Sequence, residues 1–434
     1  MRVSSLPGFI RRRRWWILGS VSVVVVCSVT AALLVGYVKY RKVVGEVHHV
    51  AVTDLGKRPP VYSTSSENIL LVGDDSRSGL DHHQQVLLHT GDDEANNTDT
   101  VMVLHISPGR HELTVMSIPR DTMMPYYQCD AGAGYAGQLA NPDAYERVNA
   151  VLAQGGPSCL WKTVEQQTGI HIDHFMELGM AGFVNVVNDL GGVSVCAPFD
   201  VDDPVSGLTL PAGEHHIDGV TALAFWRTRE DIGEGSDLQR IQRDQFMAAQ
   251  IVKATLGSGT LGNPIKLLQV AGDIAPNLTV DSGMNTSDLV SLAESLHGLS
   301  ASDVQFVTAP VVPWPLDPDA EVGLSQPAAD TMFAAIAHDS TIPASATATP
   351  SATAASPSAG TTDDSRANPA ASGEATSTPS TSPSPTDAPA SATPSSSASP
   401  SSSAIQSLAN SNGGITGAAA CSSDASAFQG PDSP

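Results

Sequence analysis

The chain has 434 residues and a formal net charge of -23 at pH 7. So acidic a chain lacks the basic surface that nucleic acid demands, and we expect no nucleic-acid partner. Between Glu67 and Asp339, however, eight of the eleven basic residues are Arg, the side chain that grips phosphate with two parallel hydrogen bonds. Composition alone leaves a phosphate site and a set of surface ion pairs equally open.

The N-terminal segment predicts a membrane anchor. Residues 15–38 carry no charged side chain, and about 20 apolar residues are enough for a helix to cross a bilayer. Five basic residues precede this stretch and three follow it closely, which favours a cytoplasmic N-terminus. We expect a basic cytoplasmic segment at 1–14, a transmembrane signal anchor at 15–38 and a juxtamembrane linker at 39–66. The alternative, a cleaved signal peptide, has a shorter apolar core and a clear cleavage site.

The C-terminal segment, residues 341–434, consists mainly of Ser, Thr, Ala and Pro. Such a composition cannot bury enough apolar surface to offset chain entropy, so it predicts disorder. A spacer threading through a cell wall and a dispensable tail are both compatible with it. The intervening residues 67–340 contain no internal repeat or linker and are predicted to form one domain.

The pattern of apolar residues predicts an α/β fold. Short apolar runs bounded by Gly, Pro or Asp predict buried strands at residues 68–73, 100–106, 112–118 and 192–197. Helical periodicity and capping residues predict helices at 158–169, 180–192 and 236–257. This order favours a layered αβα domain with a central, mainly β-sheet core flanked by helices. Sheets of this kind bind ligands at the ends of their strands.

Charged side chains gather at the predicted strand ends. They are Asp74, Asp75 and Arg77 after the first strand, Asp99 before the second, and Arg120 and Asp121 after the third. Farther along, Arg227 and Arg229 share a face if their segment is extended, as at a strand end, and Arg240 and Arg243 are neighbours on the predicted helix surface. Acids beside arginines usually form salt bridges, but they also suit a phosphorylated ligand bridged by Mg²⁺, which prefers oxygen ligands.

Three cysteines fall within the predicted domain. Cys129 and Cys159 lie in polar, loop-like sequence, and an exported domain can keep a disulfide between them. Cys196 lies in an apolar run and is predicted to be a buried free thiol.

Several other motifs lack the context that they require. Residues 132–137 fit G-x-G-x-x-G but follow no strand, so a dinucleotide site is not expected. The paired histidines lack Cys or clustered acids at metal-ligand spacing, and we predict no zinc site. The absence of a G-x-S-x-G elbow and of a Walker loop argues against a serine hydrolase and an NTPase.

Seven ordered motifs resemble those of the LytR-CpsA-Psr cell-wall ligases over residues 67–340. They include NILLVGDDSR, NNTDTVMVLHI, SIPRDT, FVNVVNDLGGVSV, LPAGEHHIDGVTALAFWRTRE and SDLQRIQRDQ. The resemblance implies a membrane-anchored enzyme that transfers a glycopolymer from a polyprenyl pyrophosphate carrier to peptidoglycan, leaving a phosphodiester bond. It also implies an apolar pocket for the polyprenyl tail between sheet and helices, and Mg²⁺ as the cofactor, with Mn²⁺ as an alternative.

The same resemblance assigns roles to residues of this chain. It implies metal binding by Asp75 and Asp99. It implies pyrophosphate binding by Arg120, Arg147, Arg227, Arg229 and Arg240, with Asp237 nearby. Asp99, Arg120, Arg227, Arg229 and Arg240 form the predicted catalytic set, since arginines and a metal stabilise charge on transferred and leaving phosphates. An acceptor sugar hydroxyl attacks phosphorus directly, and either Asp99 or Asp121 could serve as the base.

Two positions depart from the family pattern. Asn97 stands where Arg is usual, so charge assistance to a phosphate contact is lost. Asp244 stands where Gln is common and could pair with Arg240 four residues earlier. These departures keep a non-catalytic polyprenyl-pyrophosphate-glycan binding protein open as an alternative. A lipid pyrophosphatase that uses water as the acceptor is a further alternative. Arg243 best fits a surface salt bridge, and the sequence does not identify the polymer.

Overall fold

The architecture was determined as a computed structural model, which describes most of the chain between residues 45 and 347. The described ranges are 45–90, 98–125, 145–197, 200–228, 237–257, 259–260 and 262–347, with isolated residues between 27 and 41. Within these ranges no helix combines the length and apolar character needed to cross a membrane. Most of the predicted anchor and of the predicted tail lies outside the described residues, so both stay predictions.

A seven-stranded sheet forms the centre of the domain, in the order β1-β12-β7-β2-β3-β4-β13. The strands are β1 (His48–Val50), β2 (Glu67–Asp74), β3 (Thr98–Ile106), β4 (Leu113–Ile118), β7 (His174–Gly179), β12 (Leu278–Asp281) and β13 (Val304–Thr308). β2 runs antiparallel to β3 but parallel to β7. The predicted α/β domain with a central sheet is therefore confirmed, and the sheet is mixed.

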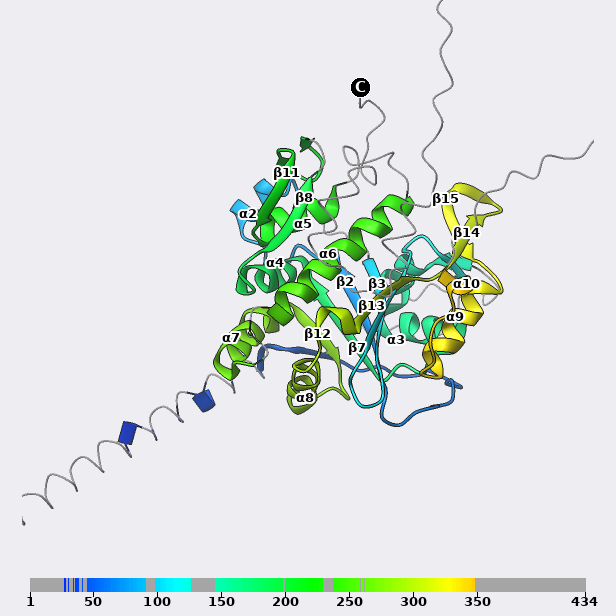
Figure 1. Ribbon diagram of the computed structural model, residues 1–434, viewed down its shortest axis with the longest axis horizontal. Coiled ribbons are helices and arrows are strands. Elements are labelled where there is room, and N and C mark those ends of the chain that lie inside the picture. Colours follow the sequence, from blue (N-terminus) through cyan, green and yellow to red (C-terminus); the bar gives the residue numbers. More distant parts are fainter. Residues whose placement is uncertain are drawn as a thin grey trace, which may run out of the picture. The chain divides into compact units, whose positions relative to one another are not determined.

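Helices cover both faces of this sheet (Figure 1). On one face, Leu70 and Val72 pack with α3 (Val148–Thr168) and α9 (Ala328–Ala337). On the other face, Ile69 and Met102 pack towards α6 (Asp237–Gly257) and α8 (Thr286–Leu296). Both faces of β2 are apolar because alternate side chains point to opposite sides of a strand and both sides are covered.

A second apolar cluster lies beside the sheet, around α4 (Met180–Asp189) and α5 (Gly219–Arg227). Two short hairpins complete it, β8 (Val193–Ala197) with β11 (Gly213–Ile217), and β9 (Val201–Asp203) with β10 (Leu208–Leu210). Helix α2 (His82–Leu87) contributes as well, through the loop that follows it. The strand predicted at 192–197 thus exists, but it pairs outside the central sheet.

The remaining elements lie around the sheet. They are the hairpins β5 (Met123–Pro125) with β6 (Tyr145–Arg147) and β14 (Val311–Trp314) with β15 (Asp317–Leu324), the helices α7 (Pro264–Ile274) and α10 (Ala344–Thr347), and the 3-10 turns η1 (Ala275–Asn277) and η2 (Ala301–Asp303).

The helix predicted at 158–169 is the second part of α3. Gly156 interrupts the helix with a φ of 77°, a left-handed value that favours glycine. Pro157 follows directly, at a helix start where a missing N–H costs nothing. The predicted helices at 180–192 and 236–257 correspond to α4 and α6.

Residues 48–59, predicted to lie in a juxtamembrane linker, pack onto the domain. β1 pairs with β12 at the edge of the sheet, and the Thr53 amide donates to Ser158 Oγ at 3.1 Å. Arg58 pairs with Glu165, whose side chain is fully buried, at 2.6 Å, and its guanidinium lies 5.4 Å from the Trp161 ring centroid. The chain therefore enters the domain along a fixed path.

The cysteines depart in part from expectation. Cys159 is fully buried and disulfide-bonded, while its predicted partner Cys129 lies outside the described residues. Cys196 is also disulfide-bonded, so the prediction of a buried free thiol is wrong. Cys196 lies on β8 in the hairpin β8–β11 and is only partly buried. Its sulfur is therefore accessible enough to form a disulfide.

Candidate functional site

A cavity of ≈ 320 Å³ lies between the central sheet and α6. Its walls are almost entirely apolar. The sheet contributes Leu71, Met102, Leu104, Leu113, Val115 and Phe306, and α6 contributes Ala248, Ile251, Val252, Thr255 and Leu256. Thr255 donates its hydroxyl to the Ile251 carbonyl at 2.8 Å, within its own helix. The cavity confirms the apolar space between sheet and helices that the motifs predicted.

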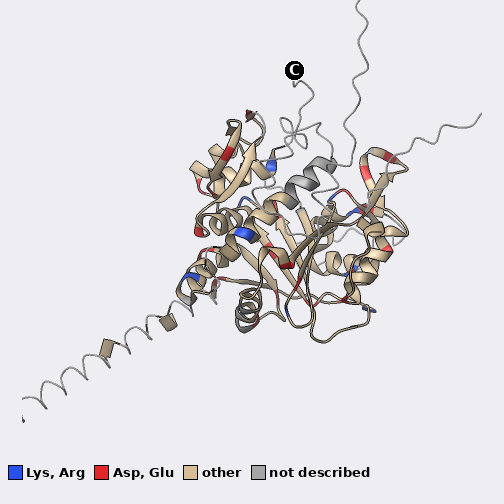
Figure 2. Ribbon diagram, viewed as in Figure 1, with Lys and Arg blue, Asp and Glu red and all other residues tan. Residues whose placement is uncertain are grey.

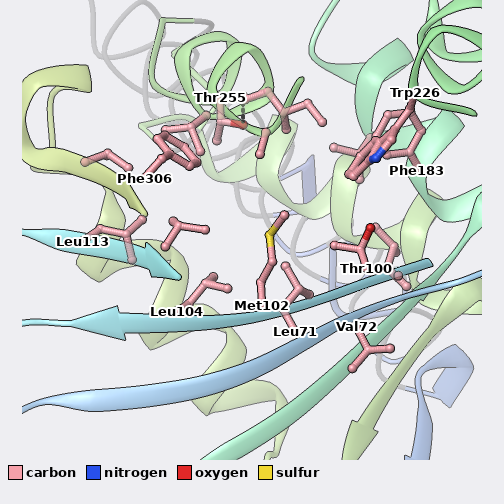
Figure 3. A pocket seen from close by; sticks show the side chains of 18 of the residues that line it. Leu71, Val72, Thr100, Met102, Leu104, Leu113, Phe183, Trp226, Thr255 and Phe306 are labelled. Atoms are coloured by element: carbon pink, nitrogen blue, oxygen red, sulfur yellow. Dashed lines mark hydrogen bonds between the residues drawn. The ribbon is translucent and has the colours of Figure 1, made fainter. Parts of the chain in front are cut away.

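One end of the cavity is polar. Figure 3 shows Thr100 at the end that Phe183 and Trp226 cover, with Leu113 and Phe306 at the opposite end. The two aromatic rings make an edge-to-face contact with centroids 4.8 Å apart. Asp74 and Arg227 also line the cavity. An amphiphile could therefore lay its apolar chain under α6 and place its charged group at this end.

The paired ends of β2 and β3 place the backbones of two predicted metal ligands near each other. The pairing shifts register where Gly73 lies opposite Thr100 and Asp74 opposite Thr98, so Asp99 is the extra residue of a bulge. Bulges redirect side chains and are common beside active sites. Asp75 follows β2 directly, so its backbone lies beside that of Asp99. The Asp99 side chain itself lies outside the described part of the structure.

Arg120 and Arg147 meet on neighbouring segments after β4. The Asn149 amide donates to the Arg120 carbonyl at 3.1 Å and the Val148 amide donates to the Thr122 carbonyl at 3.0 Å, which docks the start of α3 on this loop. Arg120 Nε lies 3.3 Å from Asp121 Oδ2, and both side chains are largely buried. These contacts hold the Arg120 guanidinium in one orientation.

Arg147 is paired with an acid from the hairpin β14–β15. Arg147 Nε lies 3.1 Å from Glu321 Oε1, and the Arg147 side chain is 39% exposed. Arg147 ends β6, whose partner strand β5 begins at Met123. The structure thus places two of the predicted phosphate-binding arginines close together in the fold, each oriented by a carboxylate.

Arg227 lies at the end of a helix, so the extended segment and strand end predicted there are wrong. Asp218 caps α5 by accepting from the Thr221 amide at 2.9 Å, and the apolar residues that follow pack in the second cluster as a helix. Arg227 Nη1 donates to the Leu88 carbonyl at 2.9 Å. A cation at a helix C-terminus is also favoured by the helix dipole.

The other predicted residues are only partly placed. Asp237, Arg240, Arg243 and Asp244 lie on α6, but their side chains are outside the described set. Arg229 and Asn97 lie outside the described residues altogether. Among the described residues, no group of three or more His, Cys, Asp and Glu is arranged to hold a metal ion. The predicted metal and phosphate roles therefore stay predictions.

Glu177 is a titratable residue that the sequence analysis missed. It lies opposite Val72 on the neighbouring strand, and Asp74 lies opposite Gly179, so Glu177 and Asp74 are diagonal neighbours on one face. Burial, and then the negative charge of Asp74, raise the pKa of Glu177 to about 7. The only signal in the sequence was an acid within a strand that is otherwise mostly apolar.

Fold and site together define a class, an α/β domain with an apolar cavity that opens on acids and arginines. The sequence matches the LytR_cpsA_psr family over residues 37–336. This match covers well over half of the chain. The protein therefore belongs to the LytR_cpsA_psr family, as its motifs predicted.

Relatives with names from cell-wall synthesis are among its matches. The chain is 36% identical over 263 residues to the cell wall biosynthesis protein LcpA of Corynebacterium glutamicum, an alignment that covers 56% of this chain and 50% of LcpA. It is 27% identical over 277 residues to the polyisoprenyl-teichoic acid–peptidoglycan teichoic acid transferase TagU of Bacillus mycoides, covering 62% of this chain and 79% of TagU. The chain spans about half the length of the corynebacterial relatives that it matches.

The fold also matches solved structures. The crystal structure of protein gbs0355 from Streptococcus agalactiae aligns with a TM-score of 0.50 at 20% identity, covering 66% of this chain and 93% of that chain. This similarity shows the fold alone.

Proposed function

We propose that this protein is a membrane-anchored phosphotransferase that moves a glycopolymer from a polyprenyl pyrophosphate carrier to peptidoglycan and leaves a phosphodiester linkage. The observation that carries the proposal is the apolar cavity under α6, which ends at Asp74, Thr100 and Arg227. Each methylene buried there contributes about 0.8 kcal/mol to binding, which favours a polyprenyl tail. Family membership and the transferase function that the name of TagU states also support this proposal.

The charged end of the cavity suits the pyrophosphate. Arg227 lines the cavity, and Arg120 and Arg147 are oriented by Asp121 and Glu321. Guanidinium groups held in place before the ligand arrives stabilise developing phosphate charge without reorganising. On this proposal Arg229 and Arg240 complete the head-group site, with Asp237 nearby.

The donor set at the ends of β2 and β3 fits Mg²⁺. This ion is usually bound by one or two carboxylates together with substrate phosphates. Asp75 follows β2, and Asp99 is the bulged residue at the paired end of β3; on this proposal their carboxylates would hold the ion. Bound Mg²⁺ would neutralise charge on the pyrophosphate oxygens, and Mn²⁺ takes similar ligands.

The transfer itself needs no protein nucleophile. A hydroxyl oxygen of the acceptor attacks the phosphorus that carries the glycan, and a new P–O bond forms. The bond from that phosphorus to the bridging oxygen breaks, and polyprenyl phosphate leaves. Asp99 or Asp121 accepts the hydroxyl proton. Arg120, Arg227, Arg229 and Arg240 stabilise the charge that develops on both phosphates.

The proposed placement follows from the sequence. The uncharged segment 15–38 anchors the protein in the cell membrane as a single span with a cytoplasmic N-terminus. The domain then lies outside the membrane and faces the cell wall, where lipid-linked donor and peptidoglycan meet. A reporter fused to either end of the full chain tests this topology.

The deciding experiment uses the full chain in nanodiscs with Mg²⁺, a polyprenyl pyrophosphate-linked glycan and peptidoglycan fragments. Covalent attachment that is lost in Asp99→Ala, in Arg229→Ala and in Arg240→Ala supports the transferase. Arg243→Ala is the matched control for Arg240→Ala, because the two arginines are one helical turn apart and only Arg240 has a predicted role. Release of lipid phosphate without attachment indicates a pyrophosphatase. Tight lipid binding without either product indicates a binding protein.

A further inference from the structure

The hairpin β14–β15 lies next to the loop that carries Arg120 and next to β6, which carries Arg147. The Val322 amide donates to the Asp121 carbonyl at 3.2 Å, and Thr122 forms a parallel bridge with Val322. Glu321, one residue earlier, pairs with Arg147. The hairpin stands out from the sheet on the side where α9 and α10 lie (Figure 1). Its position is therefore tied to the charged site by backbone and side-chain contacts.

The hairpin and β6 also share an aromatic pair. The rings of Tyr145 and Trp314 lie with centroids 4.9 Å apart and planes tilted by 44°. Tyr145 is 49% exposed, and Leu316 at the tip of the hairpin is 87% exposed. Tyr145 and Arg147 are two residues apart on β6, so they project from the same face of the strand. The aromatic pair thus lies about one strand repeat, roughly 7 Å, from Arg147.

The Trp314 ring is held by the shape of its own hairpin. A Cβ atom on Gly323 would lie 2.9 Å from Trp314 Cε3, a distance that carbon atoms do not tolerate. The missing side chain at Gly323 therefore allows the indole to lie against β15. Its contacts with Gly323 and with the tilted Tyr145 ring hold the indole in place before any ligand arrives, which lowers the entropy cost of binding.

The chemistry of this surface suits a sugar. Aromatic rings offer flat apolar faces against which the C–H faces of a pyranose pack, and Tyr and Trp add a polar group at the edge. Exposed Asp317 at the hairpin tip supplies an acceptor for sugar hydroxyls. Figure 2 shows acidic positions along the hairpin, and such a surface disfavours a further phosphate. The ligand that it fits is an uncharged, hydroxyl-rich ring.

We propose that Tyr145 and Trp314 form a carbohydrate-binding platform that holds a pyranose ring of a glycan substrate beside the predicted pyrophosphate site. The inference rests on the proposed function, because the sugar is part of the donor or of the acceptor. Donor and acceptor present the same ring chemistry, and the experiment separates them. Binding energy gained at the platform positions the glycan for transfer at the neighbouring phosphate.

The test compares Trp314→Ala and Tyr145→Ala with a matched control, Tyr62→Ala. Tyr62 is 54% exposed and packs against His338 with centroids 3.8 Å apart. The variant Tyr62→Ala therefore removes an aromatic ring of similar exposure that is not part of the proposed platform. In transfer assays with the full chain in nanodiscs, we expect the KM for one glycan substrate to rise about tenfold in both platform variants. A rise for the lipid-linked glycan identifies the donor, and a rise for peptidoglycan fragments identifies the acceptor. We expect Trp314→Phe, which keeps an aromatic face, to have a KM close to that of the unaltered protein.

Two further measurements separate a platform from a structural pair. Affinity for polyprenyl pyrophosphate without a glycan stays unchanged in the platform variants, and an equal loss of that affinity overturns the proposal. Unchanged KM values for both glycans overturn it as well. If the full chain shows no transfer activity, the platform is tested by NMR titration, which measures binding of phosphate-free cell-wall oligosaccharides. Binding that Trp314→Ala weakens and Tyr62→Ala leaves intact supports the platform, and absence of binding in the unaltered chain refutes it.

Discussion

The half-buried carboxyl of Glu177 makes the stability of this protein depend on pH. The pKa of Glu177 is raised from 4.5 to about 7 by burial and by Asp74. Between these two values the folded protein holds a proton that the unfolded chain has released. Stability therefore falls as pH rises from about 4.5 to 7, and above pH 7 the fold carries the full penalty of a buried negative charge.

The substitution Glu177→Gln removes this penalty. A shift from 4.5 to about 7 corresponds to about 3 kcal/mol at high pH. Because Glu177 remains partly accessible to solvent, screening reduces the effect, and we expect a gain of about 2 kcal/mol between pH 5 and pH 8. In a domain of this size the gain amounts to about 4 °C in Tm.

The assay is thermal unfolding of the full chain in detergent at pH 5 and pH 8, followed by circular dichroism, with EDTA present. The matched control is Glu214→Gln, which changes an exposed acid on β11. We expect the Tm difference between Glu177→Gln and the unaltered protein to grow with pH, while the control stays flat. A difference of equal size at both pH values would refute the reasoning.

Three other substitutions test separate contacts. Arg58→Met leaves the fully buried Glu165 without its partner and should lower the free energy of unfolding by about 2 to 3 kcal/mol in urea titrations; Glu165→Gln in the same chain should recover part of the loss. A hydrogen bond with Asp281 raises the pKa of His174, so this contact stabilises below pH 6.5 and fades as pH rises; His174→Gln should lower Tm more at pH 5.5 than at pH 8. Met102 lines the cavity, so the larger side chain of Met102→Trp should occupy part of its volume and weaken binding of polyprenyl phosphate at least tenfold. An unchanged Kd would place the lipid elsewhere.

The central strands could be predicted because their apolar runs are unambiguous. Residues 68–73 and 100–106 are short and almost continuously apolar, a pattern typical of strands buried on both faces of a sheet. The segment ending at Arg227 was predicted wrongly because Phe, Trp and Thr favour strands, while the decisive signal was the cap at Asp218, nine residues before the end of α5. Tertiary packing in the second apolar cluster outweighed the strand propensity of these residues.

Features that depend on distant partners could not be predicted. The apolar run at 192–197 indicated a strand, but nothing local specified β11 as its partner. The sequence around Cys196 does not distinguish a disulfide-bonded cysteine from a free thiol. The pKa of Glu177 depends on Asp74, about a hundred positions away and adjacent only through strand pairing. In each case the missing information was tertiary.

The two interpretations of the arginines, ion pairs and a phosphate site, turn out to be compatible. Arg120 and Arg147 pair with Asp121 and Glu321, yet Arg147 stays 39% exposed beside the loop where phosphate is expected. A guanidinium has five N–H donors, so a single carboxylate contact fixes its plane without consuming its capacity. Asp121 and Glu321 therefore orient the two arginines. If the proposed function holds, a pyrophosphate would meet donors that are already ordered, which would lower the entropy cost of binding.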